Sequence, residues 1–181
     1  SGQTYLLAID PYYYLRQARN IDEYGANYIR FWDDLSFAGL KQAENLVDAI
    51  LESGLKFNWS AAIRSDLFGH PRFSRERRLD VAKKFKDSGC VQVGYSLETG
   101  SPEILKMMNK RVEVSYFLEQ TELLREAGIP VGTSVVFGYP IETRETIQET
   151  FDQCLKAKVY PSIGYLLPLP YTGMYEYAKK N

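Results

Sequence analysis

The sequence predicts an α/β fold whose parallel strands form a partial, TIM-like barrel with an open lateral cleft. Strand-like and helix-like stretches alternate along the 181 residues with short connections, which is typical of right-handed parallel βαβ units. Most of the strand-like stretches are apolar on one face and small or polar on the other, whereas strands covered by helices on both faces are usually apolar throughout. Roughly five strands are too few to close an eight-stranded barrel, so a curved, open sheet around a polar cavity explains both observations.

Five stretches read as strands, and four of them have a small or polar inner face. In residues 91–98 apolar side chains alternate with Gln92, Gly94, Ser96 and Glu98, so the two sets point to opposite faces. The expected strands are residues 27–32, 58–64, 91–98, 131–137 and 161–167. Besides the four residues named above, the positions expected to face the cavity are Asn58, Ser60, Ala62, Arg64, Gly132 and Ser134.

The helices between the strands are predicted from capping residues and from apolar residues at helical spacing. Asp10 followed by Pro11 is typical of a helix start. Ser101, Pro102 and Glu103 indicate another start, because serine can cap, proline suits the first turn and glutamate complements the helix dipole. The expected helices run from 10 to 25, through Leu40 to Gly54, from 75 to 88, from 102 onward, from 113 to 127 and from 144 to 157, and a proline-rich turn is expected at 168–173.

Composition and charge argue against several classes of protein. The length and the hydrophobic content of 45% suit a single domain over residues 1–181. A net charge of −1 argues against a general nucleic-acid binder, and the basic residues between Arg72 and Lys86 are interpreted as a solvated helix face. With no stretch suited to a membrane span and no signal-peptide pattern, we expect no membrane partner and a cytoplasmic location. Cys90 and Cys154 have neither a disulfide pattern nor a metal-binding spacing, and both are expected to be buried.

Functional side chains are expected where the strands end, because ligands of such folds gather at the carboxyl ends of parallel strands. Those positions hold Asp33, Asp34, Arg64, Glu98, Gly138 and Glu142. Structural roles compete with ligand binding, because the aspartates could cap a helix, Glu142 could complement a helix dipole, and Arg64 could pair with Asp66. Glu98 follows an inner face of small residues, which favours a place in a polar pocket.

Several short motifs occur in order along nearly the whole chain. They are Phe31 to Phe37, Trp59 with Arg64 and Asp66, Ser88 to Cys90, Gly94 to Ser101, Leu105, Asn109 with Lys110, Ala127 to Ile129, Phe137 to Pro140, Glu142 with Thr143, and Pro168 to Tyr175. In their order and spacing these motifs resemble the radical S-adenosylmethionine (SAM) superfamily. The resemblance is closest to the branch in which this core often follows a cobalamin-binding domain.

The resemblance implies a partial (β/α)6 barrel of which the first βα unit is missing or incomplete in this sequence. SAM would lie across the carboxyl ends of the strands, and a small-molecule substrate would lie inside the cavity. A [4Fe–4S] cluster held by three cysteines would pass an electron from a reductant protein to SAM and so generate a deoxyadenosyl radical. Cobalamin could be supplied by a separate domain.

The same resemblance assigns SAM-binding roles to seven residues. Asp33 and Asp34 would meet the methionyl amino group, where many members carry two glycines and a glutamate instead. Arg64 would face the methionyl carboxylate or the substrate, and Glu98 would reach the amino group or the ribose hydroxyls. Gly138 would pass the adenine, and the backbone at Leu167 and Pro168 would read the adenine edge.

The sequence departs from the family in one respect, because the C-x3-C-x2-C motif expected after the first strand is absent. Three thiolates are needed to hold the cluster with one iron open to SAM. The sequence is therefore interpreted as an inactive fragment of a radical SAM enzyme. One alternative is a natural protein without the cysteines, which acts as a ligand-binding or scaffolding module. Another is an unrelated partial-barrel enzyme that uses Glu98 and Asp34 as acid and base.

Overall fold

The computed structural model describes residue 23, residues 25–31 and residues 36–180, and in this part it shows one sheet of five parallel strands. The strands are β1 (Tyr28–Phe31), β2 (Asn58–Ala62), β3 (Cys90–Glu98), β4 (Val131–Phe137) and β5 (Pro161–Tyr165). They lie side by side in sequence order, each paired in parallel with the next. This arrangement confirms the predicted α/β partial barrel, because sequential parallel strands with helical crossovers generate a curved sheet.

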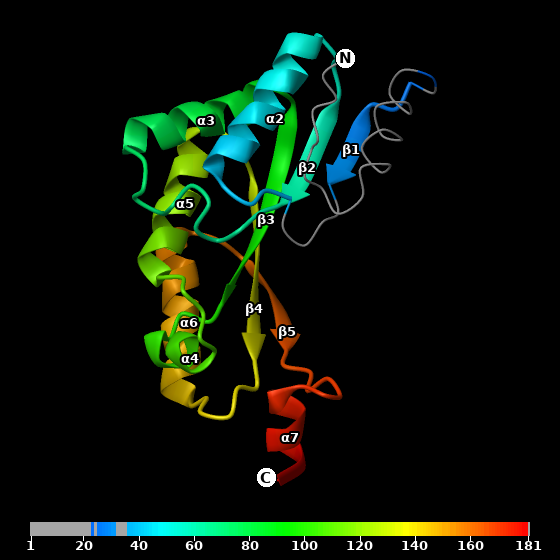
Figure 1. Cartoon of the computed structure of the whole chain (residues 1–181). Coiled ribbons are helices and arrows are strands. Elements are labelled where there is room, and N and C mark those ends of the chain that lie inside the picture. The colour runs from blue at the N-terminus through cyan, green and yellow to red at the C-terminus, as the bar shows by residue number, and fades with distance from the viewer. Residues whose placement is uncertain (1–22, 24, 32–35, 181) are drawn as a thin grey trace.

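Helices lie against one face of this sheet (Figure 1). They are α2 (Leu40–Ser53), α3 (Arg75–Asp87), α4 (Pro102–Met107), α5 (Val114–Glu126) and α6 (Arg144–Ala157), and α7 (Gly173–Lys180) follows β5 beyond the end of the sheet. The first five match the expected helices, whereas α7 was not expected, and none of its residues is buried. Among the described residues, no helix combines the length and apolar character that crossing a membrane requires.

Three local predictions needed correction or lie outside the described residues. The strands expected to end at Arg64 and Leu167 end at Ala62 and Tyr165, and the neighbouring-strand hydrogen bonds continue for one residue more, at Ile63 and Leu166. Ser101 occupies the N-cap position of α4, but its side chain makes no capping hydrogen bond with the helix. Of the helix expected from 10 to 25, residues 10–22 and 24 lie outside the described residues, and Gly25, where it was expected to stop, has a φ of +64°.

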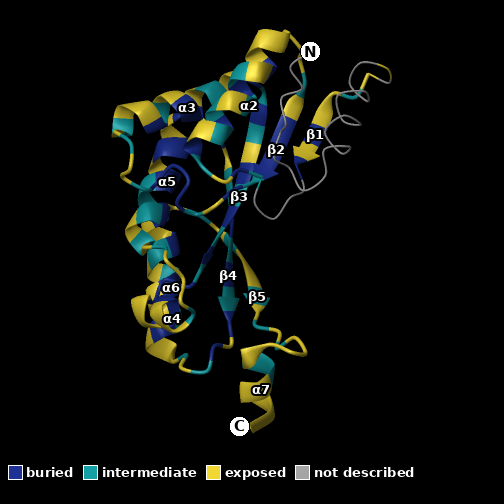
Figure 2. Ribbon diagram, viewed as in Figure 1, coloured by how far each residue is buried: buried dark blue, intermediate teal, exposed yellow. Residues whose placement is uncertain are grey.

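The hydrophobic core lies between the sheet and the helices, where Figure 2 shows the buried residues. Phe85 of α3 is at its centre, with its ring centroid 5.0 Å from that of Trp59, 5.2 Å from Phe68 and 5.5 Å from Phe37. The Trp59 indole N–H donates to the Ser88 carbonyl oxygen at 3.0 Å, so its polar group is satisfied inside the core. The strand side chains that face the helices therefore pack in the core. The opposite face of the sheet, which no helix covers, is left for a site.

Candidate ligand-binding site

The helix-free face of the sheet forms an open cavity of about 580 Å³. All five strands contribute to its lining, which includes Tyr28, Arg30, Ser60, Ala62, Gln92, Gly94, Ser96, Gly132, Ser134 and Ser162. Seven of these, Ser60, Ala62, Gln92, Gly94, Ser96, Gly132 and Ser134, were predicted from strand alternation to face the cavity. The predicted polar inner face is thus confirmed in large part. Asn58, Arg64 and Glu98 do not line this cavity, whereas Ala61, Ile63, Tyr95 and Thr133, which were expected on the opposite face, also contribute to its lining.

Strand register arranges nine of the lining residues in three parallel rows. The rows are Arg30–Ser60–Gln92 across β1 to β3, Ala62–Gly94–Gly132 across β2 to β4, and Ser96–Ser134–Ser162 across β3 to β5. The middle row therefore has almost no side chains between two polar rows. A Cβ atom built on Gly94 would come no closer to a neighbour than 3.9 Å, at the Gly132 carbonyl oxygen, so the space above Gly94 is open. A Cβ atom on Gly132 would instead meet Nε2 of Gln92 at 3.1 Å.

Polar groups of the cavity are partly engaged with one another. The Tyr28 hydroxyl lies 2.6 Å from the Ser60 hydroxyl, and the Ser96 hydroxyl donates to the Ser134 carbonyl oxygen at 3.0 Å. Ser96 also accepts a hydrogen bond from the backbone N–H of Glu98 at 3.1 Å. Since a serine hydroxyl can both donate and accept, this residue links the cavity floor to the carboxyl end of β3.

Glu98 ends β3 in a strained backbone conformation. Its φ is +64°, and the following Thr99 N–H donates to the Leu97 carbonyl oxygen at 2.9 Å, which closes a tight turn centred on Glu98. The carboxylate forms an ion pair with the ammonium group of Lys110. Non-glycine residues in this conformation are uncommon and cluster at functional sites.

The carboxyl ends of β3, β4 and β5 bring four of the predicted residues into one region. Gly138 follows β4 with φ +98°, and its N–H donates to the Glu142 carboxylate. Burial and the nearby carboxylates of Glu98 and Glu142 raise the pKa of Tyr139 to about 12. The Leu166 N–H donates to the Phe137 carbonyl oxygen at 2.7 Å, so the segment with Leu167 and Pro168 runs beside Gly138.

The guanidinium group of Arg64 is directed at a structural partner. It donates two hydrogen bonds to Asp66, from Nε to Oδ1 and from Nη2 to Oδ2, both at 2.8 Å. This pair was the predicted alternative to ligand binding. This bond with Asp66 raises the pKa of Arg64, so the arginine stays charged. Asp33 and Asp34 lie outside the described residues.

Sequence reasoning missed four residues near the site. Tyr28, Arg30 and Ser162 line the cavity, and alternation along the two outer strands would have placed them on its face. Lys110 pairs with Glu98 from a loop twelve positions away, which no local sequence pattern indicates.

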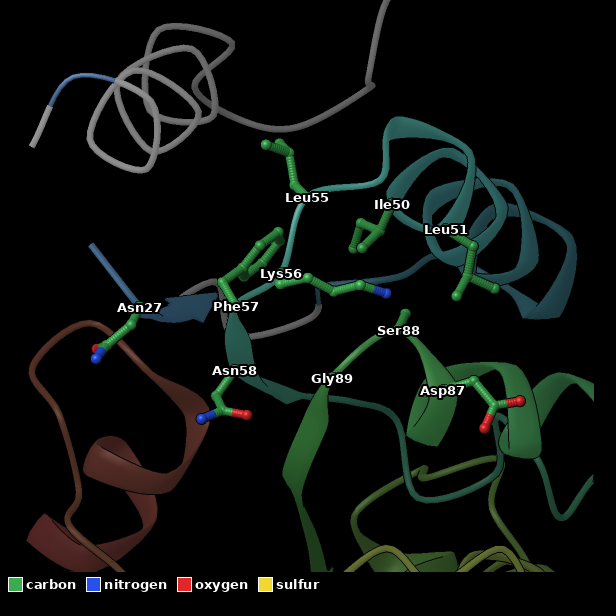
Figure 3. A pocket seen from close by; sticks show the side chains of 10 residues that line it. All are labelled: Asn27, Ile50, Leu51, Leu55, Lys56, Phe57, Asn58, Asp87, Ser88 and Gly89. Carbon is green, nitrogen blue, oxygen red and sulfur yellow. The ribbon is translucent and has the colours of Figure 1, made fainter. Parts of the chain in front are cut away.

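A separate hollow of about 350 Å³ lies at the amino-terminal ends of the strands (Figure 3). Ile50 and Leu51 from α2, Leu55 and Phe57 from the following turn, and Gly89 before β3 help to line it. Because ligands of parallel α/β folds bind at the opposite ends of the strands, this hollow is a poor candidate for the functional site.

Comparison with protein families identifies the fold. The family model of the radical SAM superfamily matches residues 8–154. The chain belongs to the radical SAM superfamily. The match spans the strands β1 to β4 that build most of the cavity, so the cavity of this chain is the interior of a radical SAM barrel.

Curated relatives within the superfamily are considerably longer than this chain. An uncharacterized methyltransferase from Pyrococcus horikoshii is 29% identical over 160 residues, which cover 88% of this chain and 33% of the relative. A tRNA-2-methylthio-N(6)-dimethylallyladenosine synthase from Protochlamydia amoebophila is 31% identical over 103 residues, covering 52% of this chain and 22% of the synthase. The chain thus spans a third or less of the length of these two relatives.

Solved structures support the fold. The radical SAM methyltransferase TsrM from Kitasatospora setae, with cobalamin and a [4Fe–4S] cluster bound, matches 88% of this chain and 32% of its own with a TM-score of 0.69 and 19% identity. The cobalamin-dependent radical SAM enzyme OxsB, with aqua-cobalamin and SAM bound, matches 89% of this chain and 23% of its own with a TM-score of 0.67 and 16% identity. The resemblance extends to cobalamin-dependent members, as the motifs suggested.

The residues present fit a small-molecule ligand but do not fit an iron–sulfur cluster. A polar cavity of about 580 Å³ lies within the usual size range of small-molecule sites. In contrast, the sequence holds only Cys90 and Cys154, both buried as predicted. Burial raises the pKa of the Cys90 thiol to about 12 and also raises that of Cys154, which disfavours the thiolate form. Two cysteines are also fewer than the three thiolates that hold such a cluster. Within the described residues, no group of three His, Cys, Asp or Glu residues could hold a metal.

Proposed function

We propose that this chain is the SAM- and substrate-binding part of a radical SAM enzyme barrel. SAM lies across the carboxyl ends of β3 to β5, and a small-molecule substrate lies over the sheet in the polar cavity. The observation that carries the proposal is the open polar cavity. Its lining residue Ser96 accepts a hydrogen bond from the backbone N–H of Glu98, so the cavity adjoins the carboxyl end of β3. The names of the relatives favour methyl or methylthio transfer as the reaction class of the whole enzyme.

Four residues at the strand ends form the core of the proposed SAM site. Glu98 is held at the rim in a strained turn, where its carboxylate can accept hydrogen bonds from an amino group or from ribose hydroxyls. Gly138 has no side chain and an exposed backbone, so a planar base can approach it closely. Leu167 and Pro168 run alongside and offer backbone carbonyl groups to the base.

The remaining three residues have less direct support. Two hydrogen bonds to Asp66 occupy Nε and Nη2 of Arg64. Arg64 is therefore proposed to contact SAM or substrate through the remaining N–H groups of its guanidinium group. Asp33 and Asp34 are proposed to meet the methionyl amino group on the basis of their place in the motif.

Radical chemistry on this barrel requires a [4Fe–4S] cluster held by cysteines from outside these 181 residues. We therefore propose that the 181 residues alone bind SAM without cleaving it. A reductant protein and a cobalamin-binding domain are proposed as further components of the whole enzyme, which we expect in the cytoplasm.

A calorimetric titration of the 181-residue chain with SAM tests this proposal. Glu98→Gln should weaken SAM binding by roughly tenfold to a hundredfold, because the loss of a charged acceptor costs about 1.5–3 kcal/mol. Glu103→Gln, which changes an exposed glutamate in the first turn of α4, is the matched control and should bind like the wild type. Undetectable SAM binding, or equal loss in both variants, would contradict the proposal.

Because Cys90 and Cys154 are both buried, one alternative is a barrel without cluster-binding cysteines that acts as a ligand-binding or scaffolding module. The enzyme and the binding module can be distinguished with the longest natural polypeptide that contains these residues. This polypeptide is reconstituted anaerobically with iron and sulfide and then incubated with SAM. Formation of deoxyadenosine from SAM supports the enzyme. SAM binding without any cluster uptake supports the module.

A further inference from the structure

A second cleft, of about 260 Å³, lies between the N-terminus of α2 and the loop that joins β2 to α3. Arg64, Asp66, His70, Arg72 and Arg111 are among its lining residues, and they come from that loop and from the segment before α5. Three arginines therefore share a small cleft in which the lining includes a single carboxylate. This concentration of positive charge is unusual for a chain with a net charge of −1.

The charges in this cleft are not balanced by the described part of the protein. Asp66 is occupied by its two hydrogen bonds with Arg64, and its side chain is only 7% exposed. Arg72 and Arg111 are exposed, and neither makes an ion pair with a described residue. Two uncompensated guanidinium groups thus line the cleft beside an approximately neutral pair.

The neighbouring arginines of α3 behave differently. Arg75 pairs with Glu126 at 2.8 Å, Arg77 with Glu44 at 2.9 Å, and Arg78 with Glu119 at 3.2 Å. These arginines of the predicted solvated helix face therefore join α3 to α2 and α5. Arg72 and Arg111 take no part in these contacts between helices, so their guanidinium groups are left for another partner.

The cleft is also rigid on the side that carries Arg72. The backbone N–H of Arg72 donates to Nδ1 of His70 at 3.1 Å, and the His70 ring packs on Tyr116 with 4.9 Å between centroids. The fully buried Gln120 holds the same loop, because its amide donates to the Arg64 carbonyl oxygen at 2.9 Å and accepts from the Phe68 N–H at 2.8 Å. Such fixed geometry reduces the entropy lost when a ligand binds.

The start of α2 adds backbone donors on the opposite side. Gly39 occupies the N-cap position and provides no side-chain cap, and it lines the cleft together with Leu40. The first turn of a 14-residue helix places backbone N–H groups and the positive end of the helix dipole there. The arginines and the helix thus favour the same sign of charge.

We propose that this cleft binds the phosphate or pyrophosphate group of a small-molecule ligand. Planar guanidinium groups bind the oxygens of a phosphate or a carboxylate in pairs, and two such groups in one cleft suit the higher charge of a phosphate or pyrophosphate. The cleft is smaller than most pockets for whole drug-sized ligands, so it suits an anionic group rather than an entire nucleotide. A net charge of −1 argues against general binding to a nucleic-acid backbone.

Titration of the 181-residue chain with pyrophosphate, followed by calorimetry at low salt, tests the proposal. We expect saturable binding by the wild type and roughly tenfold weaker binding by each of Arg72→Gln and Arg111→Gln. Arg144→Gln removes an exposed arginine from the first turn of α6, outside the cleft, and should bind like the wild type. Circular dichroism shows whether each variant is folded. If a glutamine variant does not fold, the corresponding lysine variant, Arg72→Lys or Arg111→Lys, is measured in its place. The lysine variants should bind more weakly than the wild type, because an ammonium group lacks the guanidinium fork.

Three results would overturn the proposal. They are the absence of saturable binding, equal weakening by Arg144→Gln, and tighter binding of a single-stranded oligonucleotide than of pyrophosphate. SAM binding by Arg72→Gln and Arg111→Gln should equal that of the wild type. Loss of pyrophosphate binding alone therefore leaves the SAM proposal intact, and the reverse also holds.

Discussion

Replacement of Gly94 by alanine tests whether the inner face of the sheet is open. A Cβ atom at this position would approach its nearest neighbour, the Gly132 carbonyl oxygen, at 3.9 Å, which is an ordinary contact. Glycine inside a strand costs about 0.5–1 kcal/mol relative to alanine, because it loses more backbone entropy on folding. With no steric cost to offset this gain, Gly94→Ala should raise the free energy of unfolding by about 0.5–1 kcal/mol.

Gly69 provides a contrasting control on the packed side of the molecule. A Cβ atom there would lie 1.8 Å from the Tyr116 carbonyl oxygen, so the loop after β2 would have to move away from α5. Gly69→Ala should therefore lower the free energy of unfolding by at least about 2 kcal/mol. Urea unfolding followed by tryptophan fluorescence measures both variants. A loss of more than about 1 kcal/mol in Gly94→Ala would show that the inner face is packed and would refute the cavity.

Three further predictions concern the strained turn, the buried amide and the two thiols. Glu98→Gly should be more stable than Glu98→Ala by about 1 kcal/mol in urea unfolding, because φ is +64° and only glycine adopts it without strain; equal stabilities would contradict the turn. Gln120→Ala should lower the free energy of unfolding by about 2–3 kcal/mol, since two buried backbone groups lose their partners, and a loss below about 0.5 kcal/mol would argue against the bridge. The native chain should react slowly with a thiol reagent at pH 8, because Cys90 and Cys154 are buried, whereas Ser134→Cys should add one fast-reacting thiol from the cavity; a slow third thiol would indicate a closed cavity.

Much of the fold could be predicted from the sequence because periodicity and capping are local signals. The alternation of Gln92, Gly94 and Ser96 with apolar residues fixed both the strand and the face that lines the cavity. In contrast, α7 could not be predicted, because it buries no residues and its sequence begins with a glycine after a proline-rich turn. The last strand also ends early, since β-strand pairing depends on the neighbouring strand as much as on composition.

The sequence predicted the region of the candidate site better than it predicted the side-chain partners within the site. The strand-end rule placed Glu98 and Gly138 in one region, which the structure bears out. Arg64 obeys the same rule, yet its guanidinium group is held by Asp66, an interaction that depends on the side-chain directions in a loop. The pairing of Lys110 with Glu98, like the separation of Arg72 from the paired arginines of α3, arises from tertiary contacts and has no local signature.

The most direct test of the account is to map the SAM site on the 181-residue chain by two-dimensional NMR. Addition of SAM should shift the backbone amide signals of Glu98, Gly138 and Leu167, at the carboxyl ends of β3 to β5. The signals of Leu51 and Gly89, at the opposite ends of the strands, should stay unchanged. Shifts confined to that opposite end, or to the helix-covered face, would contradict the account.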